Sequence, residues 1–249
     1  MRRFFTENSL FPDSMATISG TEARHIKTVL RMQPGDSVEL VDGSGYAYIA
    51  EIEEITDTSV QVRVHEKYAT GSESNIRLTM AIGFLKEKKM DLLVRHLTEL
   101  GIAVFLPIIT ARSIARPPEK RLASRIDRWQ TIAKEAVKQS QRGHIPEIAW
   151  PATFDEALEL SRKAHKKLIF WENAEAALPA PDAPVPDTSE AFVMIGPEGG
   201  FTEKEALVAA DQGFSPITMG PRILRAETAA IAACTLIQYL YGDIRKKRP

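Results

Sequence analysis

The fold is decided by two short segments, IGPEGGF at residues 195–201 and MGPRILR at residues 219–225. Each follows an apolar run typical of a β-strand (191–195 and 214–218) and leads into a run typical of a helix. Strands that alternate with helices predict a largely parallel α/β sheet. Loops that leave one edge of such a sheet converge on a crevice, the usual ligand site of open α/β folds. Neither segment matches G-x-G-x-x-G or G-x-x-x-x-G-K-[ST], so a dehydrogenase or a nucleotide phosphate cradle is disfavoured.

The composition predicts a folded protein of one large or two modest domains. The chain has 249 residues, and 44% of them are hydrophobic. No run of 18 apolar residues occurs, and the N-terminus lacks the apolar middle of a signal peptide, so we expect a cytoplasmic protein with no membrane segment. The single cysteine, Cys234, excludes internal disulfides and predicts a buried structural thiol.

The formal net charge of −1 gives no global argument for nucleic-acid binding, but the charges are unevenly distributed. Residues 1–75 carry a net charge of −5 and the rest of the chain +4. The stretch 112–142 holds nine basic and three acidic residues. Such a stretch would face phosphates, or it would be an ordinary solvated helix face.

The first 75 residues read as β-rich. Apolar and polar residues alternate over 37–41, 46–55 and 60–64, as expected of half-buried strands. A capping box from Ser19 to Glu22 predicts one helix over 23–31. We therefore expect a small barrel with one helix in a domain of residues 1–72, followed by a second domain of residues 73–249.

The second domain alternates strand-like and helix-like patterns. The expected strands are 77–85, 103–109, 147–150 and 168–171, besides the two that precede the glycine-proline segments. The expected helices are 88–100, 119–142, 153 to about 163, one that begins after a cap at Thr202, and 226–241. The proline-rich stretch 178–186 predicts a surface excursion.

Several short motifs along the chain carry a family resemblance. They are Arg3-Phe4-Phe5, His25 with Val29-Leu30-Arg31, Gly35-Asp36, Lys86 and Lys89 ahead of Glu99-Leu100-Gly101, Pro107, Glu135 to Gln139 with Arg142, and the two segments quoted above, extended to Ala229. With these motifs the whole chain resembles the bacterial 16S ribosomal RNA uridine-N3 methyltransferases of the SPOUT class. The pairing of GPEGG with RILRAETA at this distance is the most specific part of the match.

The resemblance implies a fold, a cofactor and partners. The implied fold is α/β: an N-terminal PUA-like β-barrel, then a SPOUT-type α/β domain with a C-terminal trefoil knot. The implied methyl donor is S-adenosylmethionine, the implied substrate is the ribosomal RNA of the small subunit, and the implied assembly is a homodimer. Such knots are rare, and nothing in the periodicity of the sequence indicates one.

The resemblance also implies that the two glycine-proline loops bind the donor, with apolar side chains on the adenine and backbone groups on its edges. The implied cofactor residues are Glu172, Ile195, Gly196, Pro197, Glu198, Gly200, Met219, Gly220, Ile223, Leu224, Arg225, Thr228 and Ala229. Simpler interpretations stay open: turn geometry for the glycines, core packing for the apolar residues, and a solvated strand end for Glu172. Glu198 would neutralise the sulfonium, orient Arg225 or cap its loop.

Methylation of uridine at N3 requires loss of the N3 proton, so the site needs a base or groups that stabilise the uracil anion. Glu135, Gln139 and Arg142 fall at i, i+4 and i+7 of the predicted long helix and would share one stripe. Arg225 is the other candidate for stabilising the anion. The alternative for the stripe is a plain polar surface.

Basic residues outside the loops are candidates for gripping RNA. They are Arg2, Arg3, Arg24, His25, Lys27, Arg31, Lys86 and Lys89. Three of them, Arg24, Lys27 and Arg31, recur at helical spacing, which also fits a solvated helix edge. The remaining histidines show no ligand spacing, so no metal is expected.

Two other functions stay open on the sequence alone. The first is ribose 2′-O methylation of an RNA by the same architecture. The second is a non-catalytic RNA-binding ribosome assembly factor that keeps the donor pocket for structure. The intact pair of loops, together with Arg225 and Glu135, argues against the second.

Overall fold

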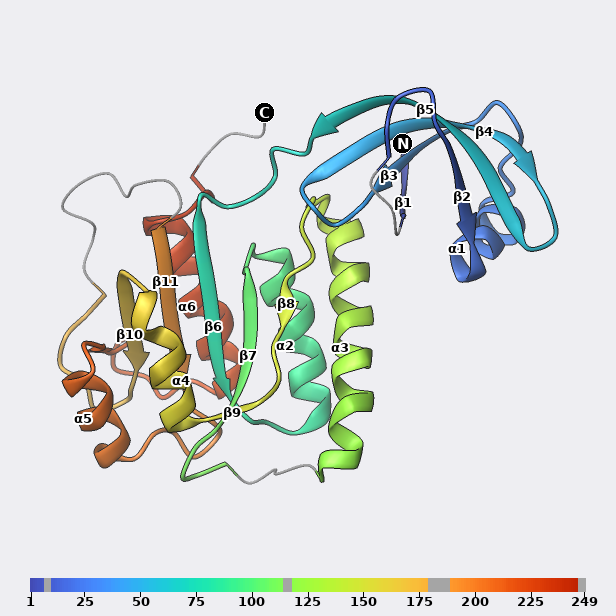
Figure 1. The fold of residues 1–249 in the computed structure, drawn as a ribbon. Helices are drawn as coiled ribbons and strands as arrows, with labels where there is room; N and C mark the ends of the chain where they lie inside the picture. The colour runs from blue at the N-terminus through green and yellow to red at the C-terminus, as the bar shows by residue number, and fades with distance from the viewer. Residues whose placement is uncertain (7–9, 114–117, 179–188, 246–249) are drawn as a thin grey trace. The chain divides into compact units, whose positions relative to one another are not determined.

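The computed structural model describes residues 1–6, 10–113, 118–178 and 189–245, which form two compact units (Figure 1). The first unit comprises Met1–Glu73 together with Val137–Ile145, and the second comprises Ser74–Ala136 and Pro146–Arg248. Most of the proline-rich stretch expected as a surface excursion, residues 179–186, lies outside the described residues. In the described part of the chain, no helix is long and apolar enough to cross a membrane.

The first unit is built on a five-stranded sheet in the order β1-β3-β4-β5-β2. The strands are β1 (Arg2–Phe5), β2 (Met15–Ser19), β3 (Ser37–Val41), β4 (Tyr46–Ile55) and β5 (Ser59–Ala69). Only the β1/β3 pair is parallel. Register shifts between β4 and β5 bend the two long strands, and the alternating apolar residues bury one continuous core.

The predicted helix of this unit is wrong in detail. The structure has a short helix α1 (Gly20–Arg24) that continues as a π-helix over His25–Leu30. The predicted capping box does not form, because Ser19 makes no side-chain cap bond and Glu22 instead pairs with Lys138 at 2.8 Å. A π-turn winds more loosely than an α-turn, so the expected stripe of basic residues at α-helical spacing does not hold here.

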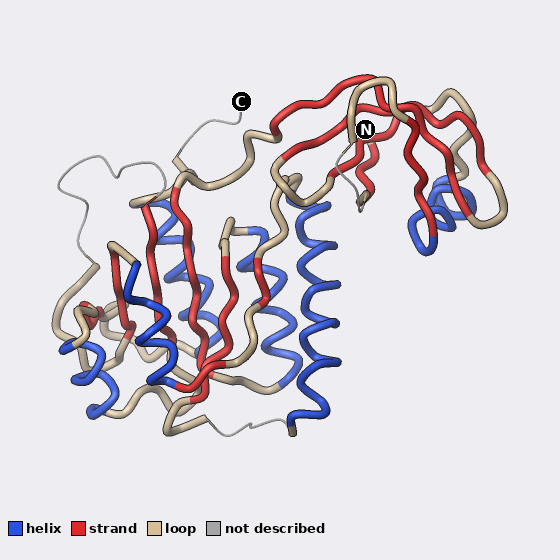
Figure 2. The backbone as a smooth tube through the Cα atoms, in the orientation of Figure 1, coloured by secondary structure: helices blue, strands red, loops and turns tan. Residues whose placement is uncertain are grey.

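The second unit contains a parallel seven-stranded sheet in the order β12-β10-β11-β6-β7-β8, with β9 also paired to β7 (Figure 2). The strands are β6 (Ile76–Gly83), β7 (Val104–Ile109), β8 (Glu147–Ile148), β9 (Ala152–Thr153), β10 (Lys166–Phe170), β11 (Ser189–Ile195) and β12 (Ser215–Ile217). The central strands read as continuous apolar runs because helices cover both faces.

Five helices accompany this sheet: α2 (Glu87–Glu99), α3 (Glu119–Ser140), α4 (Phe154–Leu160, continued by a 3₁₀ turn over Ser161–Lys163), α5 (Glu203–Asp211) and α6 (Ala226–Leu240). The helices α4 and α5 cover one face, and α2 and α6 pack on each other at the other face (Figure 1). Capping boxes begin both α4, at Thr153, and α5, at Thr202. Both caps were predicted from the sequence and are confirmed.

The C-terminal part of the chain runs from the middle of the sheet to its edge and then back to the middle. From β11 the chain passes through α5 to β12, which lies beyond β10 at the sheet edge. It then returns from this edge to α6, which packs against β11 and β6. The predicted fold class is confirmed, and these crossings lie in the segment where the family resemblance implies the knot.

Candidate functional site

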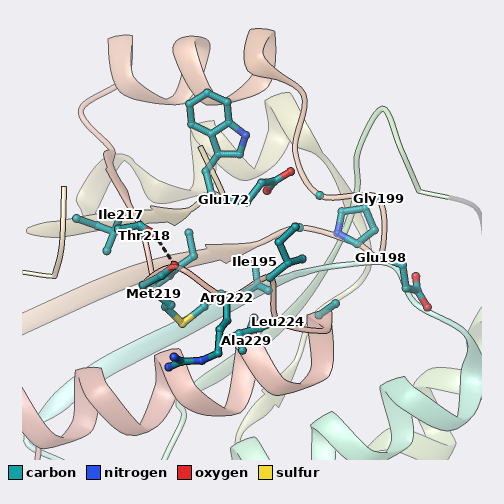
Figure 3. Close-up of a pocket in the computed structure, with 18 of the residues that line it drawn as sticks. Glu172, Ile195, Glu198, Gly199, Ile217, Thr218, Met219, Arg222, Leu224 and Ala229 are labelled. Atoms are coloured by element: carbon teal, nitrogen blue, oxygen red, sulfur yellow. Dashed lines mark hydrogen bonds between the residues drawn. The ribbon is translucent and has the colours of Figure 1, made fainter. Parts of the chain in front are cut away.

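A cavity of about 250 Å³ lies at the edge of the parallel sheet where β10, β11 and β12 end (Figure 3). Three loops form it: the residues after β10, the loop 196–200 after β11, and the loop 218–224 after β12. The first turn of α6 contributes Ala226 and Ala229, whose small side chains leave room beneath the loops. The structure therefore confirms that the two glycine-proline segments converge on one cavity.

The loop 196–200 is packed tightly against its surroundings. A Cβ atom on Gly83 would come within 2.3 Å of the Pro197 nitrogen, and one on Gly196 within 3.0 Å of the Gly200 carbonyl carbon. Gly200 has a φ of +67°, and a Cβ there would meet the Glu172 carboxylate at 2.6 Å. Close contact requires glycine at Gly83, because a Cβ there would displace backbone atoms of the loop, and the positive φ favours glycine at Gly200.

Hydrogen bonds hold the same loop from both sides. Within the loop, the Gly200 amide donates to the Pro197 carbonyl at 2.9 Å. From the segment after β7, Arg112 donates to the Gly199 carbonyl at 2.8 Å. The loop is thus fixed before any ligand arrives.

The loop 218–224 is held at its start and open at its centre. The Thr218 amide donates to the Ala176 carbonyl at 2.8 Å, and the Thr218 hydroxyl donates to the Gly220 carbonyl at 3.4 Å. Gly220 has a φ of +88°, but a Cβ there would meet nothing within 4 Å. Ile223, further on, is 90% exposed. The backbone angle, and not close packing, calls for glycine at Gly220.

The charged groups that line the cavity are Glu172, Glu198 and Arg222. Glu198 does not stand alone, because Lys89 on α2 lies 3.3 Å from its carboxylate and 3.0 Å from that of Glu227 on α6. The interaction with Glu227, and then with Glu198, raises the pKa of Lys89 above its usual 10.5. Burial alone would raise the pKa of Glu227, but hydrogen bonds from its own amide and from Lys89 lower it below 4.5. We call Lys89, Glu198 and Glu227 together the Lys89 clamp.

Most of the predicted cofactor residues line this one cavity. They are Glu172, Ile195, Gly196, Pro197, Glu198, Gly200, Met219, Gly220, Ile223, Leu224 and Ala229. Arg225 and Thr228 do not line it: Arg225 is the N-cap residue of α6, and Thr228 is exposed in the first turn. The sequence reasoning missed Phe170, Trp171, Gly199, Ile217, Thr218, Pro221, Arg222 and Ala226. Extending the loops back to their strands would have found Phe170, Trp171, Ile217 and Thr218, and taking each loop whole, with the first residue of α6, would have found the others.

The predicted stripe of Glu135, Gln139 and Arg142 does not exist as such. The helix α3 ends at Ser140, and Gln141 has a φ of +62°, so Arg142 leaves the helical register. The Arg142 side chain is buried and pairs with Glu73 at 2.6 Å. Glu135 and Gln139 are exposed on α3, and neither lines the cavity.

Several residues expected to grip RNA are engaged within the protein instead. The Arg3 guanidinium pairs with Glu39 and donates to the Arg142 carbonyl at 3.0 Å. Lys27 pairs with Asp57 at 2.6 Å, and Lys89 belongs to its clamp. The exposed residues of this set are Arg2, Arg24, His25, Lys27, Arg31 and Lys86, and of these Lys27 has its ion pair at the surface. Among the described residues, no group of three or more His, Cys, Asp or Glu side chains could hold a metal ion.

Comparison with known proteins decides the family. The model of an RNA methyltransferase domain matches residues 72–238, and that of an RNA methyltransferase PUA domain matches residues 18–64. The chain belongs to this RNA methyltransferase family. It is 31% identical to the ribosomal RNA small subunit methyltransferase E of Bacillus subtilis, over 98% of this chain and all of that protein.

Solved structures of the same family agree. The ribosomal RNA small subunit methyltransferase E of Neisseria gonorrhoeae, bound to S-adenosyl methionine, is 32% identical with a TM-score of 0.87 and covers 98% of this chain and 99% of its own. A methyltransferase of Legionella pneumophila in complex with its cofactor is 30% identical with a TM-score of 0.87, over 97% of this chain and 98% of its own. The similarity of this RNA methyltransferase to solved structures therefore covers both of its units.

Proposed function

We propose that this RNA methyltransferase transfers the methyl group of S-adenosylmethionine to N3 of a uridine in the 16S ribosomal RNA, acting on the small subunit in the cytoplasm. The observation that carries the proposal is the single cavity between the two glycine-proline loops. It lies at the sheet edge where α/β folds bind ligands, in a chain whose relatives are small-subunit RNA methyltransferases.

The cavity suits such a donor. Buried Ile195 and Ile217 and the half-buried Met219 and Leu224 offer an apolar wall for adenine. The Glu172 carboxylate, held over Gly200, can accept hydrogen bonds from ribose hydroxyls or an ammonium group. The bound donor would supply an electrophilic methyl group on a sulfonium.

The chain must then manage the uridine N3 proton and the charge that its loss creates. The anion is shared with the two uracil carbonyl oxygens, which a guanidinium would stabilise. Arg225 begins α6 beside the cavity, so it is the candidate. Glu135 stays a candidate from the sequence resemblance, whereas Arg142 is not one because it is buried against Glu73.

The proposal is tested by methyl transfer to small ribosomal subunits isolated from cells that lack the protein. We expect labelled methyl groups to appear as 3-methyluridine after nucleoside digestion, at one mapped site. A 2′-O-methylated nucleoside would overturn the N3 assignment, and donor binding without transfer to any RNA would favour an assembly factor.

The assignment of residues is tested separately by single-turnover rates. We expect Arg225→Ala to slow the methyl transfer step about 100-fold, since one preorganised donor to a developing oxyanion contributes on this scale. If both Arg225→Ala and Glu135→Gln keep the rate of the unmodified protein, neither residue acts in the step.

The proposed assembly is a homodimer. Three large apolar side chains are exposed on the packed helices α2 and α6: Leu92 at 40%, Leu236 at 41% and Tyr239 at 49%. A second copy would cover them. We expect Leu236→Asp to yield monomers in sedimentation, while Leu207→Asp, on α5 and 58% exposed, leaves the mass unchanged. An unmodified protein that sediments as a monomer would overturn the proposal.

A further inference from the structure

Two consecutive residues of the loop 218–224 line the cavity and yet face solvent. Arg222 is exposed, and Ile223 is 90% exposed, the highest value for a large apolar side chain in the described part of the chain. A side chain that borders a cavity and remains this accessible lies on its rim. An isolated exposed apolar residue needs no explanation in general, but one on the rim of a methyl-transfer site does.

Ile223 does not belong to the apolar wall proposed for the donor. Ile195 and Ile217 in that wall are at most 2% exposed, and the neighbouring Leu224 is half-buried. The chain thus anchors this loop through Leu224 and leaves Ile223 outside. Gly220, at a φ of +88°, makes the turn that brings the loop to this position.

Two arginines flank the exposed isoleucine. Arg222 and Arg225 are both exposed, and neither guanidinium makes a hydrogen bond or ion pair to any described residue. The carboxylate of Glu198, which also lines the cavity, is already paired with Lys89. Arg225 interacts electrostatically with Glu227, whose pKa it helps to lower, so Arg222 carries most of the positive charge that this rim offers to the phosphates of a nucleic acid.

An enzyme that acts on a base in structured RNA must first take that base out of its stack. Extrusion costs unstacking energy and leaves a gap in the stack. Some nucleic-acid-binding proteins insert an apolar side chain such as isoleucine between base steps. We propose that Ile223 is this wedge: it replaces the target uridine in the RNA stack while Arg222 holds an adjacent phosphate, which leaves Arg225 for the uracil anion. The proposal rests on the proposed function, because it concerns the RNA substrate of the same site.

The test uses the full-length protein and an RNA fragment that contains the mapped target uridine, with 2-aminopurine as the neighbouring base. Unstacking of that base raises its fluorescence. We expect the unmodified protein to raise the fluorescence and Ile223→Ala to lose the rise. On unmodified small subunits, kcat/KM of Ile223→Ala should fall at least tenfold, in line with the cost of one unstacked step. Ile223→Leu should retain both signals, since it keeps an apolar side chain of similar volume.

Two measurements separate the wedge from other roles of this residue. The donor affinity of Ile223→Ala, measured by calorimetry, should match that of the unmodified protein, and so should its sedimentation. A weakened donor affinity would assign Ile223 to the donor pocket. A changed oligomeric state would show that a second copy covers it. Either result overturns the wedge, as does unchanged fluorescence and turnover.

Matched variants complete the design. Leu160→Ala removes another exposed apolar side chain, at the end of α4 and 62% exposed, and should change none of the signals. Arg222→Gln should weaken RNA binding and lower the salt dependence of log K by about one phosphate contact. If the unmodified protein methylates no RNA, the proposed function fails and the wedge, which rests on it, fails with it. If the unmodified protein methylates RNA and Ile223→Ala changes neither the fluorescence nor the turnover, only the wedge fails.

Discussion

The two loops that form the cavity look alike in sequence and differ in how the protein holds them. The loop 196–200 is contacted by Gly83, Arg112, Glu172 and the Lys89 clamp, and the close approach of its backbone requires glycine at Gly83. The loop 218–224 is tied down mainly at Thr218, and its centre is open to solvent. We infer that the first loop is a preorganised wall for the donor and the second the side that meets the RNA.

The largest expected effect comes from Gly83→Ala. Its Cβ would meet the Pro197 nitrogen at 2.3 Å, so the loop 196–200 must move although Gly83 itself does not line the cavity. We expect donor affinity in calorimetry to fall about 100-fold, as for other substitutions that displace a preorganised site. Gly213→Ala, also a glycine-to-alanine change but with no atom within 4 Å, serves as the control for folding and should bind the donor normally. An unchanged affinity in Gly83→Ala would show that the loop is not rigid.

The second effect concerns the Lys89 clamp, which joins the first loop to the start of α6. Lys89→Met removes both ion pairs and leaves two carboxylates facing each other. We expect donor affinity to fall about tenfold, since partly buried charge networks contribute more than isolated surface pairs. Arg128→Met breaks another ion pair of α2, to Asp91 at 2.6 Å, and should leave donor affinity unchanged. Equal losses in the two variants would mean that α2 acts only through general stability.

The third effect is smaller and tests the open loop. Gly220→Ala meets no neighbouring atom, so only the cost of a positive φ for a residue with a Cβ remains, about 1 kcal/mol. We expect a loss in donor affinity of about fivefold, which is well below the loss for Gly83→Ala. A loss as large as that of Gly83→Ala would remove the difference between the two loops.

The sequence predicts where the two loops lie but not how the protein holds the first of them. The glycine-proline motifs locate both loops, and the alternation of strands and helices brings them to one edge, because both signals are local in the chain. The roles of Lys89 and Gly83 are not local: each depends on contacts with residues more than 100 positions away. No spacing rule shows that a lysine on α2 reaches a loop after β11.

Two other failures have specific physical causes. Arg142 was placed on a helical stripe, but a left-handed residue at Gln141 ends the helix and its guanidinium is buried against Glu73. Arg24, Lys27 and Arg31 were placed at α-helical spacing, whereas the chain forms a π-helix from His25. In both cases the local backbone departs from α-helical geometry, so the side chains do not lie on the helix face that the sequence spacing predicts.

The smallest expected effect is the change with pH in the contribution of the Lys89 clamp to donor affinity. The pKa of Lys89 is raised above 10.5, so its charge is lost only as the pH rises through that higher value. The pKa of Glu227 is lowered below 4.5, so its charge is lost only as the pH falls through that lower value. Between these limits Lys89 and Glu227 are both charged. We expect any contribution of the clamp to donor affinity to vary less than about twofold from pH 5.5 to 7.5, as measured by calorimetry.

Lys89→His should make donor affinity depend on pH in this range. An imidazole has a usual pKa of about 6.5, and the two carboxylates would raise it, so its charge is present at pH 5.5 and lost as the pH rises past neutrality. Relative to the unmodified protein in the same buffers, donor affinity of Lys89→His should fall with rising pH. The donor's own titration cancels in this ratio. A ratio that stays flat would mean that the clamp's charge does not hold the first loop, and the contrast with the second loop would then rest on close packing alone.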